Sequence, residues 1–349
     1  MKGHCIATGL LLVAALALPG CGTKVVPCSR AEIFCVGLVT ESGRRDDRSY
    51  NQAAWEGLKQ GKTEGLADWI ASIETVDARD YDENIGVFVD AGYDVIVTVG
   101  SAMDEATRAA ALKYPEIYFI GVDQPQPAEE EAIPNLAGVV FPEDQLGFLA
   151  GALAAMMTRS GKIGAVCVSD AWPPAQRYGE GYRAGAEYVN PAVEATIVYH
   201  DEVVLDKSFS DPAWSAAETD ALIDSGADVI FGVGGTTGAE ALFSAAKRGA
   251  YVVGADMDQF FILPLAAPRL LTSTVKLVTP AVVDLIAEAK QAQGRAGVFR
   301  FGDYVGQVGL APYHDLDQFI PGTVKSRMAE LSQALSLGEV QTGVSISNP

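Results

Sequence analysis

Short apolar runs alternate along the chain with longer segments in which apolar residues recur every three to four positions. The short runs are bounded by Gly, Pro or Asp and predict buried strands, whereas the longer segments predict amphipathic helices. The predicted strands cover residues 33–40, 70–76, 94–99, 117–122, 136–141, 162–168, 194–200, 228–233, 251–255 and 269–276, with a last strand near 304–309. The predicted helices cover residues 49–64, 81–92, 103–114, 143–158, 175–189, 211–226, 238–249, 278–292 and about 322–337. Because the two kinds of element alternate, we predict an α/β fold with parallel sheets.

The number of predicted strands is large for a single doubly wound sheet, and part of the sequence repeats. Residues 92–100 (Gly-Tyr-Asp-Val-Ile-Val-Thr-Val-Gly) are echoed by residues 226–234 (Gly-Ala-Asp-Val-Ile-Phe-Gly-Val-Gly). Each of the two segments follows a predicted helix and precedes another. We therefore predict two similar Rossmann-like lobes, with a ligand cleft at the carboxyl ends of their strands.

The first 20 residues have the pattern of a bacterial lipoprotein signal peptide. Residues 6–18 form an apolar stretch too short to span a bilayer, and Leu-Pro-Gly directly precedes Cys21. Cleavage before Cys21 leaves a thiol that carries a lipid and anchors the protein without a spanning helix. Residues 21–32 are then the lipidated tether. The alternative is an ordinary secretory signal that happens to end near a cysteine.

Two further cysteines, Cys28 and Cys35, flank the start of the first predicted strand. In an oxidising, exported compartment they either form a disulfide or stay reduced, and the sequence leaves both options open. Cys167 lies inside an apolar strand and is predicted to be an unreactive core thiol. Because no other Cys or His lies near the first pair, we expect no metal site, and no motif requires a cofactor.

The charge of the chain excludes one class of partner. Its 45 Asp and Glu outnumber its 25 Lys and Arg, which gives a formal net charge of −20 at pH 7. So acidic a surface repels phosphate groups. We therefore expect no nucleic acid partner.

The loop after the first predicted strand combines carboxylates, an aromatic ring and an amide. Asp46 and Asp47 precede Tyr50 and Asn51, and loops at the carboxyl ends of parallel strands line ligand sites. Ser49 is predicted to cap the following helix. Capping alone explains Ser49 but leaves the two carboxylates, the ring and the amide without a role.

Other strand ends carry similar side chains. Asp123 follows the strand at 117–122, and Trp172 and Tyr178 follow the strand at 162–168. Asp123 is either a hydrogen-bond acceptor for a ligand or a turn residue. Tyr178 is either a wall of the cleft or a core residue of its helix, as its spacing to Tyr182 also suits the core.

A glycine-rich segment at 232–238 ends one strand and opens a helix, but it fits neither GxGxxG nor a phosphate-binding P-loop. Its glycines suit a close approach of backbone amides to a ligand. Asp256 and Lys276 each follow or end a later strand and are predicted to form charge-assisted hydrogen bonds to ligand hydroxyls. Asp211, followed by Pro212, is predicted to be a structural helix cap.

Taken in order over residues 33–320, these segments resemble the basic membrane protein family of bacterial solute-binding lipoproteins. The family's first loop ends in Ser-Phe-Asn-Gln-x-Ala-Trp-Glu-Gly, matched here at 49–57 with Tyr50 in place of Phe. The family's Arg-Phe-x-x-Gly-Phe is matched at 177–182 with Tyr178 in place of Phe, and its Thr-Ser-x-x-Lys at 272–276. A further departure is the Arg44-Arg45 pair in a loop that is usually rich in glycine.

The resemblance implies a type I periplasmic-binding-protein fold with three hinge crossings, near 138–142, 258–268 and 292–303. Lobe 1 would comprise residues 33–138 and 268–292, and lobe 2 residues 139–267 and 293–345. In the family's purine nucleoside receptors, aromatic rings stack on the base, and a glycine loop, an Asp and a Lys hold the sugar. The predicted ligand-binding residues are Asp46, Asp47, Tyr50, Asn51, Asp123, Trp172, Tyr178, Gly234, Gly235, Thr236, Asp256 and Lys276.

The function that the resemblance implies is that of a lipid-anchored, extracytoplasmic substrate-binding protein of an ABC importer. It would capture a nucleoside, purine nucleosides being favoured, and pass it as a monomer to separate permease and ATPase chains. The alternatives are a binding protein for a sugar or other polar solute, a ligand-sensing lipoprotein and, more remotely, a nucleoside hydrolase. The last is disfavoured because His200 and His314 lie outside the cleft motifs and no nucleophile elbow is present.

Overall fold

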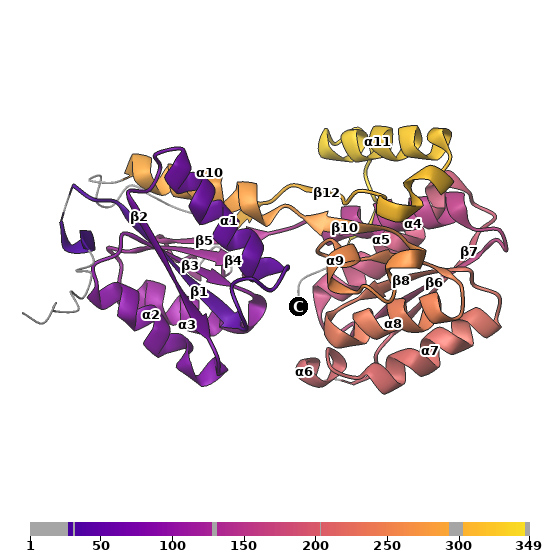
Figure 1. Ribbon diagram of the computed structural model, residues 1–349, viewed down its shortest axis with the longest axis horizontal. Helices are drawn as coiled ribbons and strands as arrows, with labels where there is room; N and C mark the ends of the chain where they lie inside the picture. The colour runs from indigo at the N-terminus through magenta and orange to yellow at the C-terminus, as the bar shows by residue number, and fades with distance from the viewer. Residues whose placement is uncertain (1–26, 31, 128–130, 203, 293–302, 346–349) are drawn as a thin grey trace, which may run out of the picture.

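The computed structural model describes residues 27–345 except 31, 128–130, 203 and 293–302, and the chain forms two lobes joined side by side (Figure 1). The predicted signal peptide, the lipid site Cys21 and most of the tether lie outside the described residues. Each lobe is built on one six-stranded sheet with helices on both faces. The predicted α/β fold with two Rossmann-like lobes is confirmed.

The first sheet has the strand order β11-β5-β4-β3-β1-β2, and all of its pairings are parallel. Its strands are β1 (Cys35–Ser42), β2 (Trp69–Thr75), β3 (Val95–Val99), β4 (Tyr118–Val122), β5 (Leu136–Val140) and β11 (Asp303–Val305). Its helices are α1 (Tyr50–Thr63), α2 (Tyr81–Asp90), α3 (Asp104–Lys113) and α10 (Val278–Ala292). Helices α1 and α10 pack together on one face, and α2 and α3 cover the other.

The second sheet has the order β12-β10-β9-β8-β6-β7, in which only the β10–β12 pairing is antiparallel. Its strands are β6 (Lys162–Cys167), β7 (Glu194–Tyr199), β8 (Val229–Val233), β9 (Tyr251–Gly254), β10 (Leu270–Lys276) and β12 (Val308–Leu310). Its helices are α4 (Glu143–Met157), α5 (Pro173–Val189), α6 (Leu205–Ser208), α7 (Pro212–Asp224), α8 (Gly235–Lys247), α9 (Gln259–Ile262) and α11 (Gly322–Ser336). Helices α4 and α5 cover one face, with α11 over α4, and α7 and α8 cover the other.

The chain passes between the lobes three times in the described residues, but two of the passages differ from the predicted ones. The three observed passages lie between β5 and α4, between β10 and α10 at Leu277, and between β11 and β12 near Gly306. The first agrees with the predicted crossing at 138–142, and the other two do not coincide with those at 258–268 and 292–303. The sequence prediction puts β10 in lobe 1, but β10 is hydrogen-bonded to β9 in the second sheet. It puts β11 in lobe 2, but β11 pairs with β5 in the first sheet. Backbone hydrogen bonds decide which sheet each of these strands joins, and the apolar pattern of a strand does not specify its partner.

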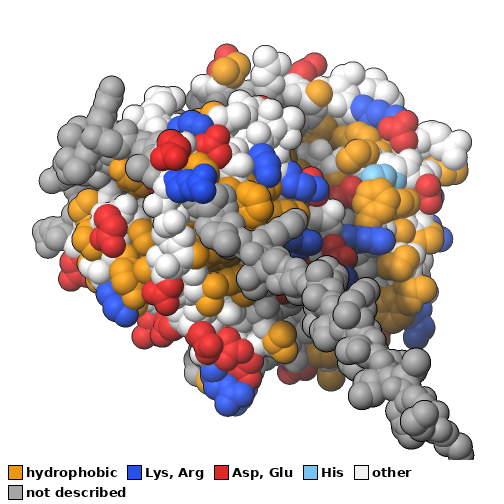
Figure 2. Space-filling model, turned by 60° about the vertical axis from the view of Figure 1, so that its left-hand side comes forward, with side chains coloured by type: hydrophobic (Ala, Val, Ile, Leu, Met, Phe, Trp, Pro, Cys, Tyr) orange, Lys and Arg blue, Asp and Glu red, His pale blue; other side chains and the backbone are white. Residues whose placement is uncertain are grey.

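Cys28 and Cys35 form a disulfide in the structure. It ties the short turn Pro27–Ser29 to the start of β1, at the end of the sheet opposite the carboxyl ends of the strands. In the described part of the chain, none of the helices combines the length and the apolar character needed to cross a bilayer. On the face drawn in Figure 2, acidic and basic side chains lie next to one another, so the negative charge is not gathered in one patch there.

Candidate functional site

The ammonium group of Lys276 lies at the centre of a buried ionic cluster between the lobes. Its Nζ is 2.9 Å from Asp123 Oδ1, 3.1 Å from Glu143 Oε1 and 3.6 Å from Asp256 Oδ1. Asp123 follows β4 in the first sheet, whereas Lys276 ends β10 in the second. The Lys276–Asp123 pair therefore bridges the two lobes at the base of the cleft.

Charge and burial oppose each other in this cluster. Burial alone would lower the pKa of Lys276, whose side chain is fully buried, but the charges of Asp123 and Glu143 outweigh it and hold the pKa well above its usual range. Burial also disfavours the charged form of Glu143, yet Lys276 and Arg177 hold the pKa of that carboxyl below its usual value. Burial raises the pKa of Asp123 despite the nearby ammonium. Removing one partner from such a buried set of charges strongly destabilises the folded protein, because it leaves an uncompensated buried charge.

Asp256 is shared by the cluster and by the predicted stacking residues. The hydroxyl of Tyr178 donates to Asp256 Oδ1 over 2.5 Å. Tyr50 reaches toward the same carboxylate from the other lobe: burial raises the pKa of the Tyr50 phenol, and the charge of Asp256 raises it further. The Tyr50 ring centre also lies 5.8 Å from Lys276 Nζ, within the range of a cation–π contact.

The prediction that the Tyr178 ring faces a ligand does not fit this conformation. Tyr178 has no exposed surface, and its ring packs edge-on against Phe231 in the core of the second lobe, 5.8 Å between centroids. The alternative reading from its spacing to Tyr182 therefore describes the ring correctly. Only the hydroxyl of Tyr178 points toward the cluster.

The first loop uses its carboxylates locally. Asp46 is exposed and forms an ion pair with Arg44 over 2.7 Å. Asp47 Oδ1 accepts hydrogen bonds from the backbone N–H groups of Ser49 (2.7 Å) and Gln52 (3.1 Å), so it caps α1. Ser49 makes no side-chain cap, which corrects the sequence prediction. Asp47 takes that role because it is already aimed at the free amides of the first helical turn.

Asn51 is buried beside this loop, and its amide donates to the carbonyl of Arg44 over 3.3 Å. Among the described residues its Oδ1 has no hydrogen-bond partner. A buried acceptor of this kind carries a desolvation cost unless a further group reaches it.

The glycine-rich loop opens α8 but packs against its own lobe. Gly234 has φ +94°, and a Cβ there would meet Val168 at 2.4 Å, so glycine is required. The N–H and hydroxyl of Thr236 both donate to the Phe209 carbonyl, at 3.0 and 3.2 Å. In this structure the loop is thus held by a neighbouring segment, not by the lobe interface.

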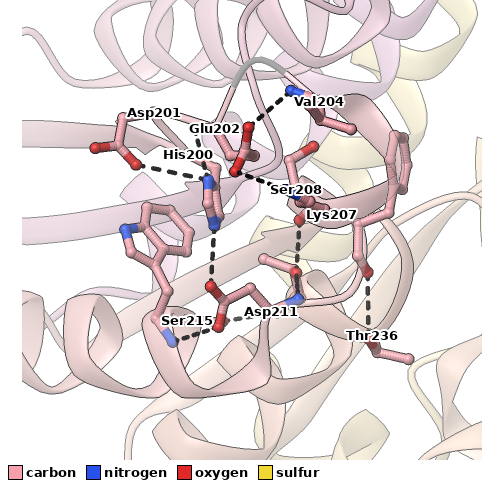
Figure 3. A network of polar contacts seen from close by, with 12 residues as sticks. His200, Asp201, Glu202, Val204, Lys207, Ser208, Asp211, Ser215 and Thr236 are labelled. Atoms are coloured by element: carbon pink, nitrogen blue, oxygen red, sulfur yellow. Dashed lines mark hydrogen bonds and ion pairs between the residues drawn. The ribbon is translucent and has the colours of Figure 1, made fainter.

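That neighbouring segment is fixed by the network in Figure 3. His200 Nδ1 accepts from the Glu202 N–H (2.9 Å), and its Nε2 lies 3.4 Å from Asp211 Oδ2. Asp211 also accepts from the Trp214 N–H, which confirms its predicted role as the cap of α7. His200 is therefore used to hold a loop, and it lies in a different network from Lys276.

A cavity of about 490 Å³ opens beside the ionic cluster and is lined by both lobes. Asp123 and Trp172, both predicted from the sequence, line it together with Glu143 and Arg177. The Trp172 ring is held edge-on by Phe209 at 5.0 Å. Trp172 and Phe141 are therefore aromatic residues that border this cavity, and Trp172 is the one predicted from the sequence.

A second cavity, of about 440 Å³, lies between the start of α1 and α9. Arg48 lines it from the first lobe and donates to the Phe261 carbonyl of the second over 2.9 Å. Arg48 has φ +60°, a strained value for a residue with a side chain, and its own N–H is held by Gln52 Oε1 at 3.0 Å. This contact is a second polar bridge between the lobes.

Three side chains near the ionic cluster are not among the residues predicted from the sequence: Glu143, Arg177 and Glu41. Glu143 starts α4 directly after the first hinge passage, and Arg177 Nε binds it over 2.8 Å. Glu41 lies near the end of β1 against Gly100, where a Cβ would come within 2.0 Å of its Oε2. Burial, followed by the charges of Asp123 and Asp47, raises the pKa of Glu41 to about 7. The sequence signal that could have found Glu41 is its position, since it directly follows the predicted strand 33–40 as Asp123 follows the predicted strand 117–122.

Two lobes on separate sheets, with three passages of the chain between them, define the type I periplasmic-binding-protein fold. The described residues hold no group of three or more His, Cys, Asp or Glu placed to bind a metal.

The chain belongs to the family described as ABC transporter substrate-binding protein PnrA-like, whose sequence profile matches residues 34–340. The resemblance seen in the sequence is thereby confirmed. Basic membrane protein B of Borreliella afzelii is 32% identical over 80% of this chain and 80% of its own length. The ABC transporter nucleoside-binding protein BmpA of Lactococcus lactis subsp. cremoris is 29% identical over 85% of this chain and 88% of its own.

Solved structures agree on the fold. An ABC transporter solute-binding protein from Conexibacter woesei superposes with a TM-score of 0.67 at 22% identity, covering 88% of this chain and 98% of that one. One from Aeropyrum pernix K1 gives 0.65 at 24% identity, covering 88% and 92%.

Proposed function

We propose that this protein is the lipid-anchored binding subunit of an ABC importer, which captures a nucleoside between its lobes and delivers it to a permease. The observation that carries the proposal is the Lys276 cluster, in which Asp123 and Asp256 from different lobes meet one ammonium at the base of the cleft. A ligand that binds both lobes favours the closed state by its differential affinity. The similarity to a protein named for nucleoside binding supports this choice of ligand.

The lipid anchor at Cys21 and the extracytoplasmic location belong to the same proposal. They rest on the signal-like N-terminus and on the matches to basic membrane proteins. The disulfide between Cys28 and Cys35 supports an oxidising compartment.

A sugar or other polyol is the second candidate ligand. It is favoured by the burial of Tyr178, which leaves Trp172 as the predicted ring that lines the cavity between the lobes. The carboxylates of Asp123 and Asp256 could accept hydrogen bonds from the hydroxyl groups of either ligand.

The test is a thermal-shift screen of the protein beginning at Gly22, so that the disulfide is kept, against nucleosides, free bases, sugars and amino acids. Hits are followed by calorimetry. A ligand at about 100 times its Kd adds about 2.7 kcal/mol of stability. Binding of nucleosides supports the proposal, binding of sugars alone moves it to the second candidate, and release of free base from a bound nucleoside would make the protein a hydrolase.

A further inference from the structure

The position of Tyr178 separates what its ring does from what its hydroxyl does. The side chain has no exposed surface, so it does not touch a ligand in the cleft. Its hydroxyl nevertheless donates to Asp256 Oδ1 over 2.5 Å, a short hydrogen bond to a charged acceptor. Its hydrogen bond to the cluster therefore passes through Asp256.

Asp256 has acceptor capacity left for a ligand. A carboxylate offers about four lone-pair sites; the Tyr178 hydroxyl occupies one of them, and the Tyr50 hydroxyl from the other lobe is directed at the same carboxylate. Lys276 Nζ lies 3.6 Å from the same oxygen, beyond an ordinary hydrogen bond. The Asp256 side chain keeps 24% of its surface exposed, whereas that of Lys276 keeps none. Asp256 is thus the member of this pair that a ligand can reach.

The hydroxyl is delivered from a rigid element. Helix α5, which carries Tyr178, packs so closely on α4 that a Cβ at Gly181 would lie 2.2 Å from the Asp144 carbonyl oxygen. Asp256, by contrast, sits in a loop after β9 with φ +69°. A donor on a fixed helix therefore selects one orientation of a side chain carried by a loop.

We propose that Tyr178 is a positioning residue: its hydroxyl fixes the Asp256 carboxylate so that it accepts from a ligand hydroxyl, and it thereby sets the preference for ligands with vicinal hydroxyl groups. The inference rests on the proposed function for its ligand.

The chain supplies a matched control. Tyr182 lies one turn further along α5, is equally buried and stacks on the same Phe231 at 5.4 Å. Among the described residues its hydroxyl has no hydrogen-bond partner. Tyr178→Phe and Tyr182→Phe thus remove the same atom from similar surroundings, and only the first removes a bond to Asp256.

The experiment measures the affinity of both variants for inosine and for 2′,3′-dideoxyinosine by calorimetry. Tyr178→Phe is expected to weaken inosine binding about ten-fold and to leave the dideoxy analogue within two-fold, because only inosine uses the positioned carboxylate. Tyr182→Phe should change neither. Equal losses for both ligands, or no loss, would overturn the inference. If wild-type protein binds only sugars, the same comparison is made with ribose and 2-deoxyribose.

A ligand-free measurement separates this inference from the proposed function. The free energy of unfolding is compared in a cycle of Tyr178→Phe, Asp256→Ala and the double variant. Tyr178→Phe should destabilise the protein in the wild-type background and not in the Asp256→Ala background. Additive effects would overturn the positioning role whatever the ligand. If coupling is found but no nucleoside or sugar binds, the proposed function fails, and the role in ligand preference fails with it.

Discussion

The first loop and the Lys276 cluster both bring carboxylates and cations together, but they do so over different distances along the chain. Arg44 pairs with Asp46 two residues away, in solvent. Lys276 pairs with Asp123 across 153 residues and two lobes, out of solvent. Local pairs need only a turn, whereas the long-range pair forms only when both sheets and their passages are in place. The comparison teaches that carboxylates in a loop at a strand end can find their partners within the loop itself, as Asp46 and Asp47 do.

The largest effect should come from breaking the long-range cluster. Lys276→Met keeps the apolar stem but leaves Asp123, Glu143 and Asp256 without their ammonium. We expect a loss of about 3–5 kcal/mol in the free energy of unfolding at pH 7, measured with urea and circular dichroism. The loss should shrink as the pH falls and the carboxyls become protonated.

The control for this variant is Lys59→Met, which removes a half-exposed pair with Glu56 on one helix. It should cost no more than about 0.5 kcal/mol. Similar losses for the two lysines would contradict the contrast between the two regions.

A smaller effect is expected at Glu41, which lies between the two regions. Its pKa is raised from 4.5 to about 7, so between these pH values the folded protein keeps a proton that the unfolded chain has released. The stability from this proton is fully present below pH 4.5 and is lost as the pH rises through about 7. Glu41→Gln lacks this loss, so its advantage over wild type should grow from pH 5 to pH 8.

The measurement is denaturant unfolding of both proteins at several pH values in that range. Glu56→Gln, an exposed carboxyl on α1, serves as the control and should show no such trend. A difference between Glu41→Gln and wild type that stays constant with pH would mean that Glu41 is ionised throughout.

The smallest effects on stability should come from the first loop, where the two carboxylates are expected to differ from each other. Asp47→Ala removes the cap of α1 and should cost about 1 kcal/mol, whereas Asp46→Ala should leave the stability unchanged, because its ion pair with Arg44 is screened by solvent. Thermal unfolding of the two variants side by side gives the answer. If Asp46→Ala instead abolished ligand binding while leaving stability unchanged, Asp46 would regain the role that its position in the loop predicted.

Much of the fold could be predicted from the sequence, because buried positions are occupied by apolar residues at the spacing of a strand or a helix. The apolar run at 162–168 became β6 almost residue for residue, and Asp211-Pro212 marked the start of α7. Strand β10 was also found but was assigned to the wrong lobe. Its partners β9 and β12 are chosen by backbone hydrogen bonds, which side-chain periodicity does not encode.

The candidate site was foreseen in part, for a related reason. Asp123, Asp256 and Lys276 stood at strand ends, and in an open sheet such positions converge on one edge. The position of Tyr178 in the sequence was compatible with the cleft and with the core. Its packing on Phe231 shows that the ring lies in the core. Glu143 and Arg177 lie on helices, and neither the pairing of Glu143 with Lys276 nor that of Arg177 with Glu143 could be predicted before the helices were packed.

The sequence by itself determined the elements, the two-lobed α/β class, the family and the strand ends where polar groups gather, because periodicity and local motifs depend on near neighbours. The tertiary structure alone decided which sheet each late strand joins, which carboxylates share one ammonium and which hydroxyl reaches Asp256. These outcomes depend on contacts between residues far apart in the chain. Such contacts form only when the chain is folded, so a pattern of neighbouring residues does not specify them.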